Sequence, residues 1–462
     1  MKQFMEKYMN RNIFREYDIR GIVSTDLTDD VVYDLGRAFG TFLLKNNSIN
    51  MSVSGDIRHT TMNLKKHFIN GVLSMGIDVY DMGVLPTPAN YFSLFTTEIE
   101  NSVQITGSHN PSEYNGFKFS YNKKPFYGKS IQILRNIIEK KMYSEKSIRG
   151  SLYKTHVLNN YMNYLIDNFQ FNKKLTVSVD CGNASACLVA PYIYDKLNLK
   201  VHKIYCDVNP DFPNHHPDPT VDSNLNDLID NVIVNNSDLG IAFDGDADRI
   251  VVVDNKGKII RSDILLSLFV PHVINKGDTV VYDVKCSNSL KETILKFGGV
   301  PIMCATGHSI VKNKIYENNS KLGGEMSGHI FFSDKFFGFD DALYVSLRLL
   351  DILSSSNIKL SDMVNSIPVY SSTPEIRLDC KDDDEKNTIV GKIKKYFIEN
   401  YKCETIDGVR VIFENGWALI RSSNTQPAIV LRLEANNELF LENYKTIILD
   451  KLNEFSGYNV SI

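Results

Sequence analysis

The sequence has few cysteines, and none of the seven stands in a CxxC pair. An odd, scattered set of thiols argues against a disulfide framework and favours a reduced, cytoplasmic protein. The chain also lacks an apolar run long enough to span a bilayer, and its opening stretch, MKQFMEKYMNRNIFREYDIRG, is too polar for a signal peptide. We therefore expect no membrane partner.

A strong charge of either sign is also missing. The chain carries 51 basic and 55 acidic residues, a net charge of −4. Such a balance gives no electrostatic basis for binding nucleic acid, so any anion must be bound locally by a few cations and backbone amides. The length of 462 residues is too great for one hydrophobic core and predicts several domains.

Strand and helix patterns alternate through most of the chain, which predicts mostly parallel sheets covered by helices. One predicted helix covers residues 184–197, ASACLVAPYIYDKL. The last stretch groups three strand patterns between two helices, as in an α+β domain. The fold class predicted is α/β, with three similar mixed α/β domains and a C-terminal α+β domain. Their expected limits are 1–152, 153–258, 259–368 and 369–462.

The segment AFDGDADRIVVVD carries the strongest chemical signal. Asp244, Asp246 and Asp248 follow a predicted strand at every second position. Three carboxylates brought that close would repel one another, and a hard divalent cation such as Mg²⁺ would resolve this. The alternatives are an acidic turn and an EF-hand, but the latter needs glycine and glutamate where Arg249 and Asn255 stand.

A phosphate fits beside such an ion, because Mg²⁺ usually keeps positions for water or phosphate oxygens. Ser108, in TGSHNP, is the candidate carrier, since a serine hydroxyl can accept a phosphoryl group and return it. His109 follows it directly, and Lys118 lies one short strand further on and can neutralise charge or share in proton transfer. Arg249 can orient a phosphoryl oxygen or form an ion pair with one of the aspartates.

Two further loops carry polar groups next to glycine or proline. In GGEMSGHI, Glu325 and Ser327 alternate and can bond adjacent sugar hydroxyls, while His329 can act as a general acid or base. A glycine-rich hairpin would look similar. The loop IRSSNTQP joins one arginine to successive hydroxyl and amide donors, which favours a phosphate cradle over a plain polar loop; its members are Arg421, Ser423, Asn424 and Thr425. His215 and His216 are flanked by prolines and are interpreted as structural.

These motifs, in this order, resemble those of the α-D-phosphohexomutase superfamily over essentially the whole chain. The resemblance rests on FREYDIRG, TGSHNP, DGDADR, GEMSGH and RSSNTQP. Met326 favours the phosphomannomutase/phosphoglucomutase branch, because the phosphoglucosamine mutase branch typically has glutamine there. The resemblance implies four domains around a central cleft, with one loop from each. It also implies cleft positions for Tyr17, Arg20, Lys285, His308 and His329.

The implied reaction converts hexose 1-phosphate and hexose 6-phosphate, of mannose or glucose, into one another. Phospho-Ser108 would give its phosphoryl group to the sugar and take the other one back, through a hexose 1,6-bisphosphate that also serves as activator. One Mg²⁺ would be held by Ser108 and the three aspartates, and either Lys118 or His329 would handle the proton. The expected partners are small sugar phosphates, with the chain a monomer or weak homo-oligomer. Alternatives are a phosphoglucosamine mutase, a phosphohydrolase with Asp244 as nucleophile, and a non-catalytic sugar-phosphate-binding paralogue.

Overall fold

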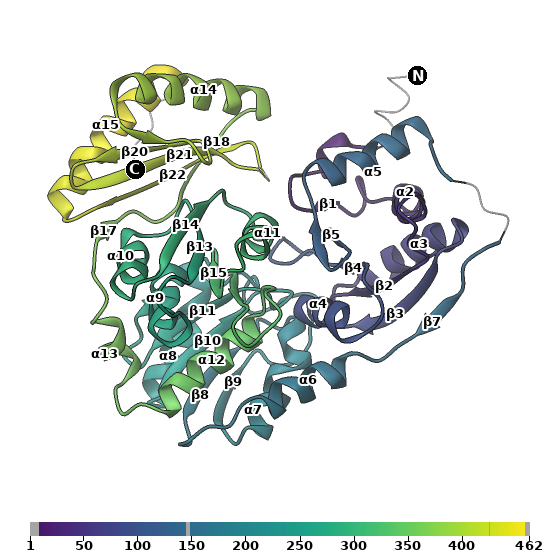
Figure 1. The fold of residues 1–462 in the computed structure, drawn as a ribbon, viewed down its shortest axis with the longest axis horizontal. Helices are drawn as coiled ribbons and strands as arrows, with labels where there is room; N and C mark the ends of the chain where they lie inside the picture. The colour runs from purple at the N-terminus through teal and green to yellow at the C-terminus, as the bar shows by residue number, and fades with distance from the viewer. Residues whose placement is uncertain (1–8, 145–147, 425, 458–462) are drawn as a thin grey trace. The chain divides into compact units, whose positions relative to one another are not determined.

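The computed structural model describes residues 9–144, 148–424 and 426–457. The chain divides into two compact units (Figure 1). Unit 1 comprises the chain up to Ser262 together with Ser327–Val364, and unit 2 comprises Asp263–Met326 and the chain from Asn365 onward.

The first sheet of unit 1 has the strand order β1-β5-β4-β2-β3-β7, with β6 added beside β5. Strands β4, β2, β3 and β7 are parallel neighbours, whereas β1, β5 and β6 form antiparallel pairs at the other side. The strands are β1 (Ile19–Ile22), β2 (Asn50–Gly55), β3 (Asp78–Val84), β4 (Ser102–Ile105), β5 (Tyr114–Tyr121), β6 (Lys124–Phe126) and β7 (Leu152–Lys154).

Three helices, α2, α3 and α5, share one hydrophobic core with this sheet. Helices α2 and α3 cross closely because Gly36 and Gly71 face each other, where an added Cβ would meet backbone oxygen at 2.2 and 2.1 Å. Figure 1 shows α2, α3 and α5 grouped beside the sheet. The elements are η1 (Arg11–Ile13), α2 (Asp29–Lys45), α3 (Thr61–Ser74), α4 (Thr87–Thr96) and α5 (Lys129–Lys140).

The second sheet of unit 1 has the order β12-β11-β10-β8-β9. Strands β10, β8 and β9 are parallel, and β10, β11 and β12 are antiparallel neighbours. The strands are β8 (Thr176–Asp180), β9 (Lys200–Ile204), β10 (Leu239–Phe243), β11 (Ile250–Asp254) and β12 (Ile259–Ile260). The other elements of unit 1 are α6 (Leu158–Asp167), η2 (Ser185–Leu188), α7 (Ala190–Lys196), η3 (Asp222–Leu225), α8 (Asn226–Val234), β16 (Ile330–Phe332), α12 (Ala342–Ser354) and α13 (Leu360–Val364).

The predicted helix over 184–197 is wrong as one element. The structure has the 3₁₀ helix η2 and then α7, whose first turn contains Pro191. Proline has no backbone N–H and suits the first turn of a helix, but it interrupts a helix that would continue through it. A new helix, α7, therefore begins at Ala190, next to this proline.

Unit 2 opens with another parallel arrangement, in which β13 lies between β14 and β15. Its elements are α9 (Ser262–Val273), β13 (Thr279–Asp283), α10 (Asn288–Lys296), β14 (Val300–Cys304), α11 (His308–Asn318) and β15 (Leu322–Gly324). Because the strands are parallel, the chain leaves β13, β14 and β15 at one edge. That edge carries Lys285, His308 and Glu325.

The C-terminal part of unit 2 is an antiparallel sheet with two long helices. The order is β17-β22-β21-β20-β19, and β18 also pairs with β22. Apolar residues of α14 and α15 share one core with the sheet strands. The elements are β17 (Ser371–Ser372), β18 (Ile376–Asp379), α14 (Asp383–Asn400), β19 (Cys403–Glu404), β20 (Val409–Phe413), β21 (Gly416–Ser422), β22 (Ala428–Ala435) and α15 (Glu438–Ser456). The predicted fold class, α/β parts followed by an α+β part, is confirmed.

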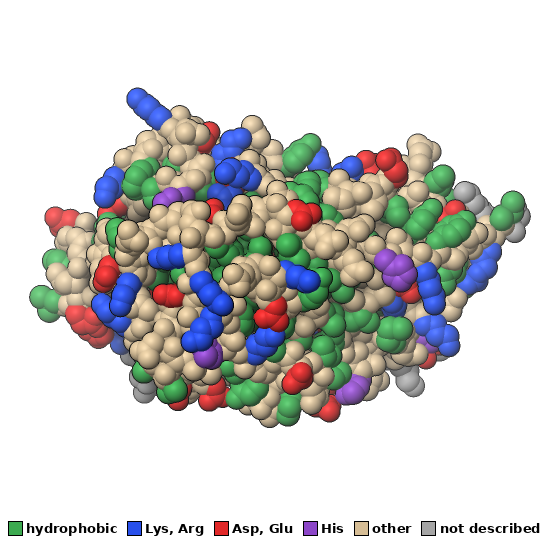
Figure 2. Space-filling view, turned by 90° about the horizontal axis from the view of Figure 1, so that it is seen from below, with side chains coloured by type: hydrophobic (Ala, Val, Ile, Leu, Met, Phe, Trp, Pro, Cys, Tyr) green, Lys and Arg blue, Asp and Glu red, His purple; other side chains and the backbone are tan. Residues whose placement is uncertain are grey.

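The face of the molecule seen in Figure 2 matches the balanced composition. On the face seen in Figure 2, acidic, basic and apolar side chains of the described residues are interspersed. Among the described residues, no helix combines the length and the apolar character that a membrane crossing requires.

Candidate active site

The loop between β10 and β11 brings three carboxylates together. Asp244 Oδ1 accepts hydrogen bonds from the backbone N–H groups of Asp248 and Arg249, each at 3.1 Å, which folds the loop back on itself. As a result, one oxygen from each of Asp244, Asp246 and Asp248 lies within 4.8 Å of the others, and all three side chains are fully buried. Three buried carboxylates in this arrangement can hold a metal ion.

The hydrogen bonding of the loop also fits a cation. Asp246 Oδ1 and Asp248 Oδ1 are buried and have no hydrogen-bond partner among the described residues. A buried carboxylate oxygen without a partner is unfavourable, and coordination to a hard divalent ion would satisfy it. The all-oxygen set suits Mg²⁺ better than softer metals.

Lys118, on β5, is the cation nearest to these acids. Its Nζ donates to Asp246 Oδ2 and Asp248 Oδ2, both at 2.6 Å. Burial lowers the pKa of Lys118, but the two carboxylates outweigh it and raise the pKa well above its ordinary value. Lys118 is therefore held as a cation. Separately, burial and repulsion from the other two aspartates raise the pKa of Asp244.

Ser108 meets the acidic loop directly. Its Oγ donates to Asp244 Oδ2 at 3.0 Å and lies 3.1 Å from His109 Nδ1. The residue has φ +48°, a left-handed conformation that is unusual for serine. A serine hydroxyl between a group of carboxylates and an imidazole can accept and release a phosphoryl group.

Gly245 allows this contact, because a Cβ added there would lie 2.2 Å from the Ser108 carbonyl oxygen. We expect Gly245→Ala to push the two loops apart, lower the free energy of unfolding by about 1–3 kcal/mol and reduce activity strongly. Denaturant unfolding and a turnover assay measure the two effects. Gly391→Ala is the matched control, since a Cβ on Gly391, within α14, meets nothing within 4 Å; equal effects of the two changes would contradict the steric argument.

Arg58, which the sequence analysis did not single out, shapes the serine loop. Its guanidinium is only 2% exposed and forms an ion pair with Asp56 at 3.3 Å. A lone arginine outside every motif gives no sequence signal for this role. The backbone carbonyls that accept from its terminal amino groups are those of Ser108, Asn110, Pro111 and Tyr114.

Arg249 and His329 form a second layer around the acidic loop. Arg249 Nε donates to His329 Nε2 at 2.9 Å, and His329 Nδ1 lies 3.0 Å from Asp340 Oδ2. Because Nε2 accepts, the imidazole proton in this arrangement is on Nδ1. Asp340, fully buried, therefore fixes the ring that orients Arg249. Sequence reasoning missed Asp340, which belongs to none of the motifs.

The first motif of the chain also reaches the serine loop. Arg20, on β1, donates through Nη1 to Asn110 Oδ1 and through Nη2 to Asp18 Oδ2. Tyr17 is half-buried just before β1. His216, interpreted from sequence as structural, contacts the carbonyl oxygen of His109 through Nε2. Part of the proline-rich loop therefore lies against the serine loop.

The residues predicted to bind sugar are divided between the two units. Ser327 is half-buried in unit 1. Glu325, buried in unit 2, accepts from the Gly307 N–H at 2.5 Å. His308 begins α11, next to this bond. Lys285 Nζ lies 2.9 Å from Glu375 Oε2.

The environment of Glu325 predicts a pH-dependent stability. Burial, aided by repulsion from Asp283, raises its pKa from 4.5 to about 7. Between these values the folded protein binds the additional proton, so stability falls as pH rises through this range. Glu325→Gln mimics the protonated acid and should be more stable than wild type at pH 8, by up to about 3 kcal/mol, but similar at pH 5.

Denaturant unfolding at the two pH values measures this effect. Glu317→Gln changes an exposed glutamate of α11 and serves as the control. A gain from Glu325→Gln that is equal at both pH values would show that ionisation of this carboxyl is not the cause.

The predicted phosphate cradle lies at the end of β21. Arg421 and Ser423 are buried and Asn424 is half-buried, whereas Thr425 lies outside the described residues. Lys386, from α14, donates to the carbonyl oxygens of Ser423 and Gln426 at 2.8 and 3.1 Å. This buried lysine also forms an ion pair with Asp383, so it braces the backbone of the loop. Its position within a helix pattern gave no sequence signal.

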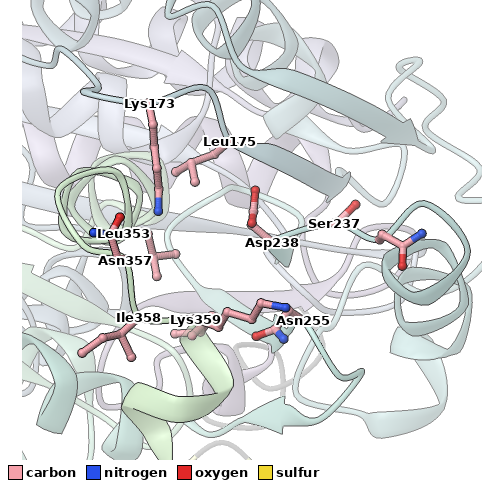
Figure 3. A pocket seen from close by; sticks show the side chains of 11 residues that line it. Lys173, Leu175, Ser237, Asp238, Asn255, Leu353, Asn357, Ile358 and Lys359 are labelled. Atoms are coloured by element: carbon pink, nitrogen blue, oxygen red, sulfur yellow. The ribbon is translucent and has the colours of Figure 1, made fainter.

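A separate hollow in unit 1 is lined by none of the predicted site residues (Figure 3). Three of its polar side chains are engaged within the protein. Lys173 donates to the Ser356 carbonyl at 2.5 Å, Asp238 accepts from the Thr176 N–H, and Asn255 accepts from the Ser361 N–H. These bonds give the three side chains structural roles.

Comparison with known families covers nearly the whole chain. Four models match in order: "Phosphoglucomutase/phosphomannomutase, alpha/beta/alpha domain I" at residues 11–145, domain II at 158–257, domain III at 261–370, and the C-terminal domain at 375–451. The chain belongs to the phosphoglucomutase/phosphomannomutase family. The predicted resemblance is thereby confirmed.

Individual relatives agree with this assignment. The chain is 41% identical to the phosphomannomutase/phosphoglucomutase of Pseudomonas aeruginosa, over 96% of this chain and 95% of the relative. It is 38% identical to the phosphoglucomutase of Neisseria meningitidis serogroup A, over 94% and 95%. A crystal structure of a phosphoglucomutase/phosphomannomutase family protein from Burkholderia thailandensis has a TM-score of 0.89, 36% identity and coverage of 96% and 98%.

Proposed function

We propose that the chain interconverts the 1-phosphate and 6-phosphate of a hexose, mannose or glucose or both, as a phosphohexomutase. The observation that carries this proposal is the 3.0 Å contact between Ser108 Oγ and Asp244, within a group of three buried carboxylates. The relative at 41% identity, named phosphomannomutase/phosphoglucomutase, supports the choice of substrates.

The proposed reaction has two transfers. In the first, the bond between phosphorus and Ser108 Oγ breaks, and the free hydroxyl of a hexose 1-phosphate forms a new bond to phosphorus as it loses its proton. The product is a hexose 1,6-bisphosphate, which also serves to prime unphosphorylated enzyme. In the second transfer the other phosphate returns to Ser108, and the hexose 6-phosphate leaves. Positioning and charge neutralisation are the main requirements of such a transfer.

Asp244, Asp246, Asp248 and an oxygen on Ser108 would hold one Mg²⁺. When bound, it supplies positive charge to the transferring phosphoryl group. The two buried oxygens without a hydrogen-bond partner support this set of ligands. Asp244 is an unsuitable nucleophile, because Oδ1 accepts two backbone N–H groups and Oδ2 accepts from Ser108.

In this proposal, one residue neutralises the charge of the phosphoryl group and a different residue accepts the proton of the sugar hydroxyl. Lys118 is held as a cation by two aspartates and is suited to neutralise the phosphoryl group rather than to accept a proton. His329 Nε2 carries a lone pair, shown by its bond from Arg249, and can take the proton of the sugar hydroxyl once Arg249 pairs with the phosphoryl oxygens. His109 contributes a second imidazole at the serine oxygen.

Substrate recognition would come from the remaining loops. We propose that each of four domains, 1–152, 153–258, 259–368 and 369–462, contributes one of them. The sugar would be contacted by Tyr17, Arg20, Lys285, His308, Glu325 and Ser327. The phosphate that does not react would be bound by Arg421, Ser423, Asn424 and Thr425.

The test measures turnover of mannose, glucose and glucosamine 1-phosphates with the purified protein, Mg²⁺ and a catalytic amount of glucose 1,6-bisphosphate. Interconversion of the mannose or glucose phosphates is expected, with intact mass showing one phosphoryl group gained from the bisphosphate. Preference for glucosamine phosphate would identify a phosphoglucosamine mutase. Binding of hexose phosphates without turnover would overturn the catalytic proposal.

A further inference from the structure

The carboxylate of Asp407 joins two loops of unit 2 that no sequence motif connects. Its Oδ2 accepts from Arg421 Nε at 2.8 Å and from the backbone N–H of Thr306 at 3.1 Å. The Asp407 and Arg421 side chains are only 14% and 6% exposed. The contact between these two side chains is therefore largely shielded from water.

The backbone fixes Asp407 in this position. The next residue, Gly408, has φ +70°, and a Cβ added to it would lie 2.3 Å from the Ile420 carbonyl oxygen and 2.7 Å from Arg421 Cα. Only glycine tolerates both the conformation and the close approach. The turn before β20 therefore packs against the backbone of Arg421. This packing places the Asp407 carboxylate beside the Arg421 side chain.

The contact with Thr306 extends the connection to a second predicted site loop. Thr306 donates its N–H to Asp407, and the next N–H, of Gly307, donates to Glu325 Oε1 at 2.5 Å. Two consecutive amides of one turn thus bind two carboxylates. One belongs to the predicted sugar loop, and the other holds the arginine of the predicted phosphate cradle.

We propose that Asp407 is a positioning residue for substrate binding. It engages Arg421 through Nε, which fixes the plane of the guanidinium, while an arginine can grip a phosphate with its two terminal amino groups. It also ties Arg421 to the 306–307 turn, so that the phosphate cradle and the Glu325 loop keep a fixed relation. This inference rests on the proposed function, in which Arg421 binds the phosphate that does not react.

Two substitutions separate geometry from charge. Asp407→Asn loses the charge but can keep both hydrogen bonds, because both donors use one oxygen and an amide oxygen can replace it. Asp407→Ala loses both bonds. A misplaced binding group can weaken function by up to about 100-fold, so we expect Asp407→Ala to raise KM for glucose 1-phosphate about 10- to 100-fold, with kcat changed far less. Asp407→Asn should stay close to wild type.

Glu404→Ala is the matched control, because Glu404 forms an ion pair with Arg410 at 3.1 Å in the same sheet and neither residue belongs to the proposed site. KM should be unchanged. In addition, the double variant Asp407→Ala/Arg421→Ala should be no worse than Arg421→Ala, since Asp407 acts through that arginine. Additive losses would overturn the proposal, as would a wild-type KM in Asp407→Ala or equal losses in the alanine and asparagine variants.

Calorimetric binding of glucose 6-phosphate separates this inference from the proposed function. Absence of turnover in the wild type would refute the proposed function. If Asp407→Ala still binds glucose 6-phosphate more weakly than both wild type and Asp407→Asn, the role of Asp407 as a positioning residue would remain supported. Thermal unfolding verifies that each variant is folded. If Asp407→Ala does not fold, Asp407→Ser replaces it, with the same expected order of affinities.

Discussion

Ser108→Ala should lower hexose phosphate interconversion by about 10⁴-fold or more, because the change removes the only atom proposed to carry the phosphoryl group between substrates. The methyl group of alanine can neither form a phosphate ester nor bond to Asp244, which lies 3.0 Å from the native hydroxyl. A coupled turnover assay measures the loss. Intact mass after incubation with glucose 1,6-bisphosphate should show a phosphoryl group on wild type and none on the variant.

The neighbouring Ser112 provides the matched control for this experiment. It lies four residues further along the same loop and is exposed. Ser112→Ala should retain both turnover and phosphorylation. Full activity of Ser108→Ala, together with phosphate found on Asp244, would reverse the assignment and identify the acidic loop as the source of the nucleophile.

Asp246→Asn should raise the Mg²⁺ concentration needed for half-maximal activity by at least about 10-fold and lower kcat about 10²- to 10³-fold. The amide is neutral and offers one oxygen, while Asp246 Oδ1 is the buried atom that a cation would satisfy. Loss of the negative charge also weakens the ion pair with Lys118, whose Nζ donates to Asp246 Oδ2 at 2.6 Å. Activity titrations with Mg²⁺, after treatment with a chelator, measure both quantities.

Asp254→Asn is the control for the metal prediction. Asp254 is a buried aspartate at the far end of β11, where Oδ1 accepts from the N–H groups of Lys256 and Lys258. Its amide can keep both bonds, so the Mg²⁺ dependence should be unchanged. If the wild type retains full activity in excess chelator, or if both variants shift the Mg²⁺ requirement equally, the three aspartates do not hold a catalytic ion.

The sequence predicted those parts of the site that are encoded in short segments. The alternation of three aspartates identified a converging loop, and the polar residues around Ser108 marked a strand end. The family and fold class predicted from these motifs are confirmed by four consecutive family matches. The predicted continuous helix over 184–197 is wrong. The prediction followed the apolar pattern and neglected Pro191, which interrupts a continuing helix.

Residues that act on the site from isolated positions could not be found in this way. Arg58 lies fifty residues before the loop whose carbonyls it binds, and Asp340 reaches Arg249 only through His329. Asp407 follows no motif and is recognised only by the bonds of its carboxylate. A charged residue outside a motif has the same appearance in sequence whether it faces water or a buried partner.

The sequence by itself determined the chemistry available to this protein: a serine and a set of acids that follow predicted strands, together with several cations. Local spacing suffices for that, because strand ends and tight turns are set by neighbouring residues. Only the tertiary structure decided which of these groups meet. The contact of Ser108 with Asp244 joins two different sheets across more than a hundred residues of chain, and such a contact depends on how whole elements pack rather than on any segment alone.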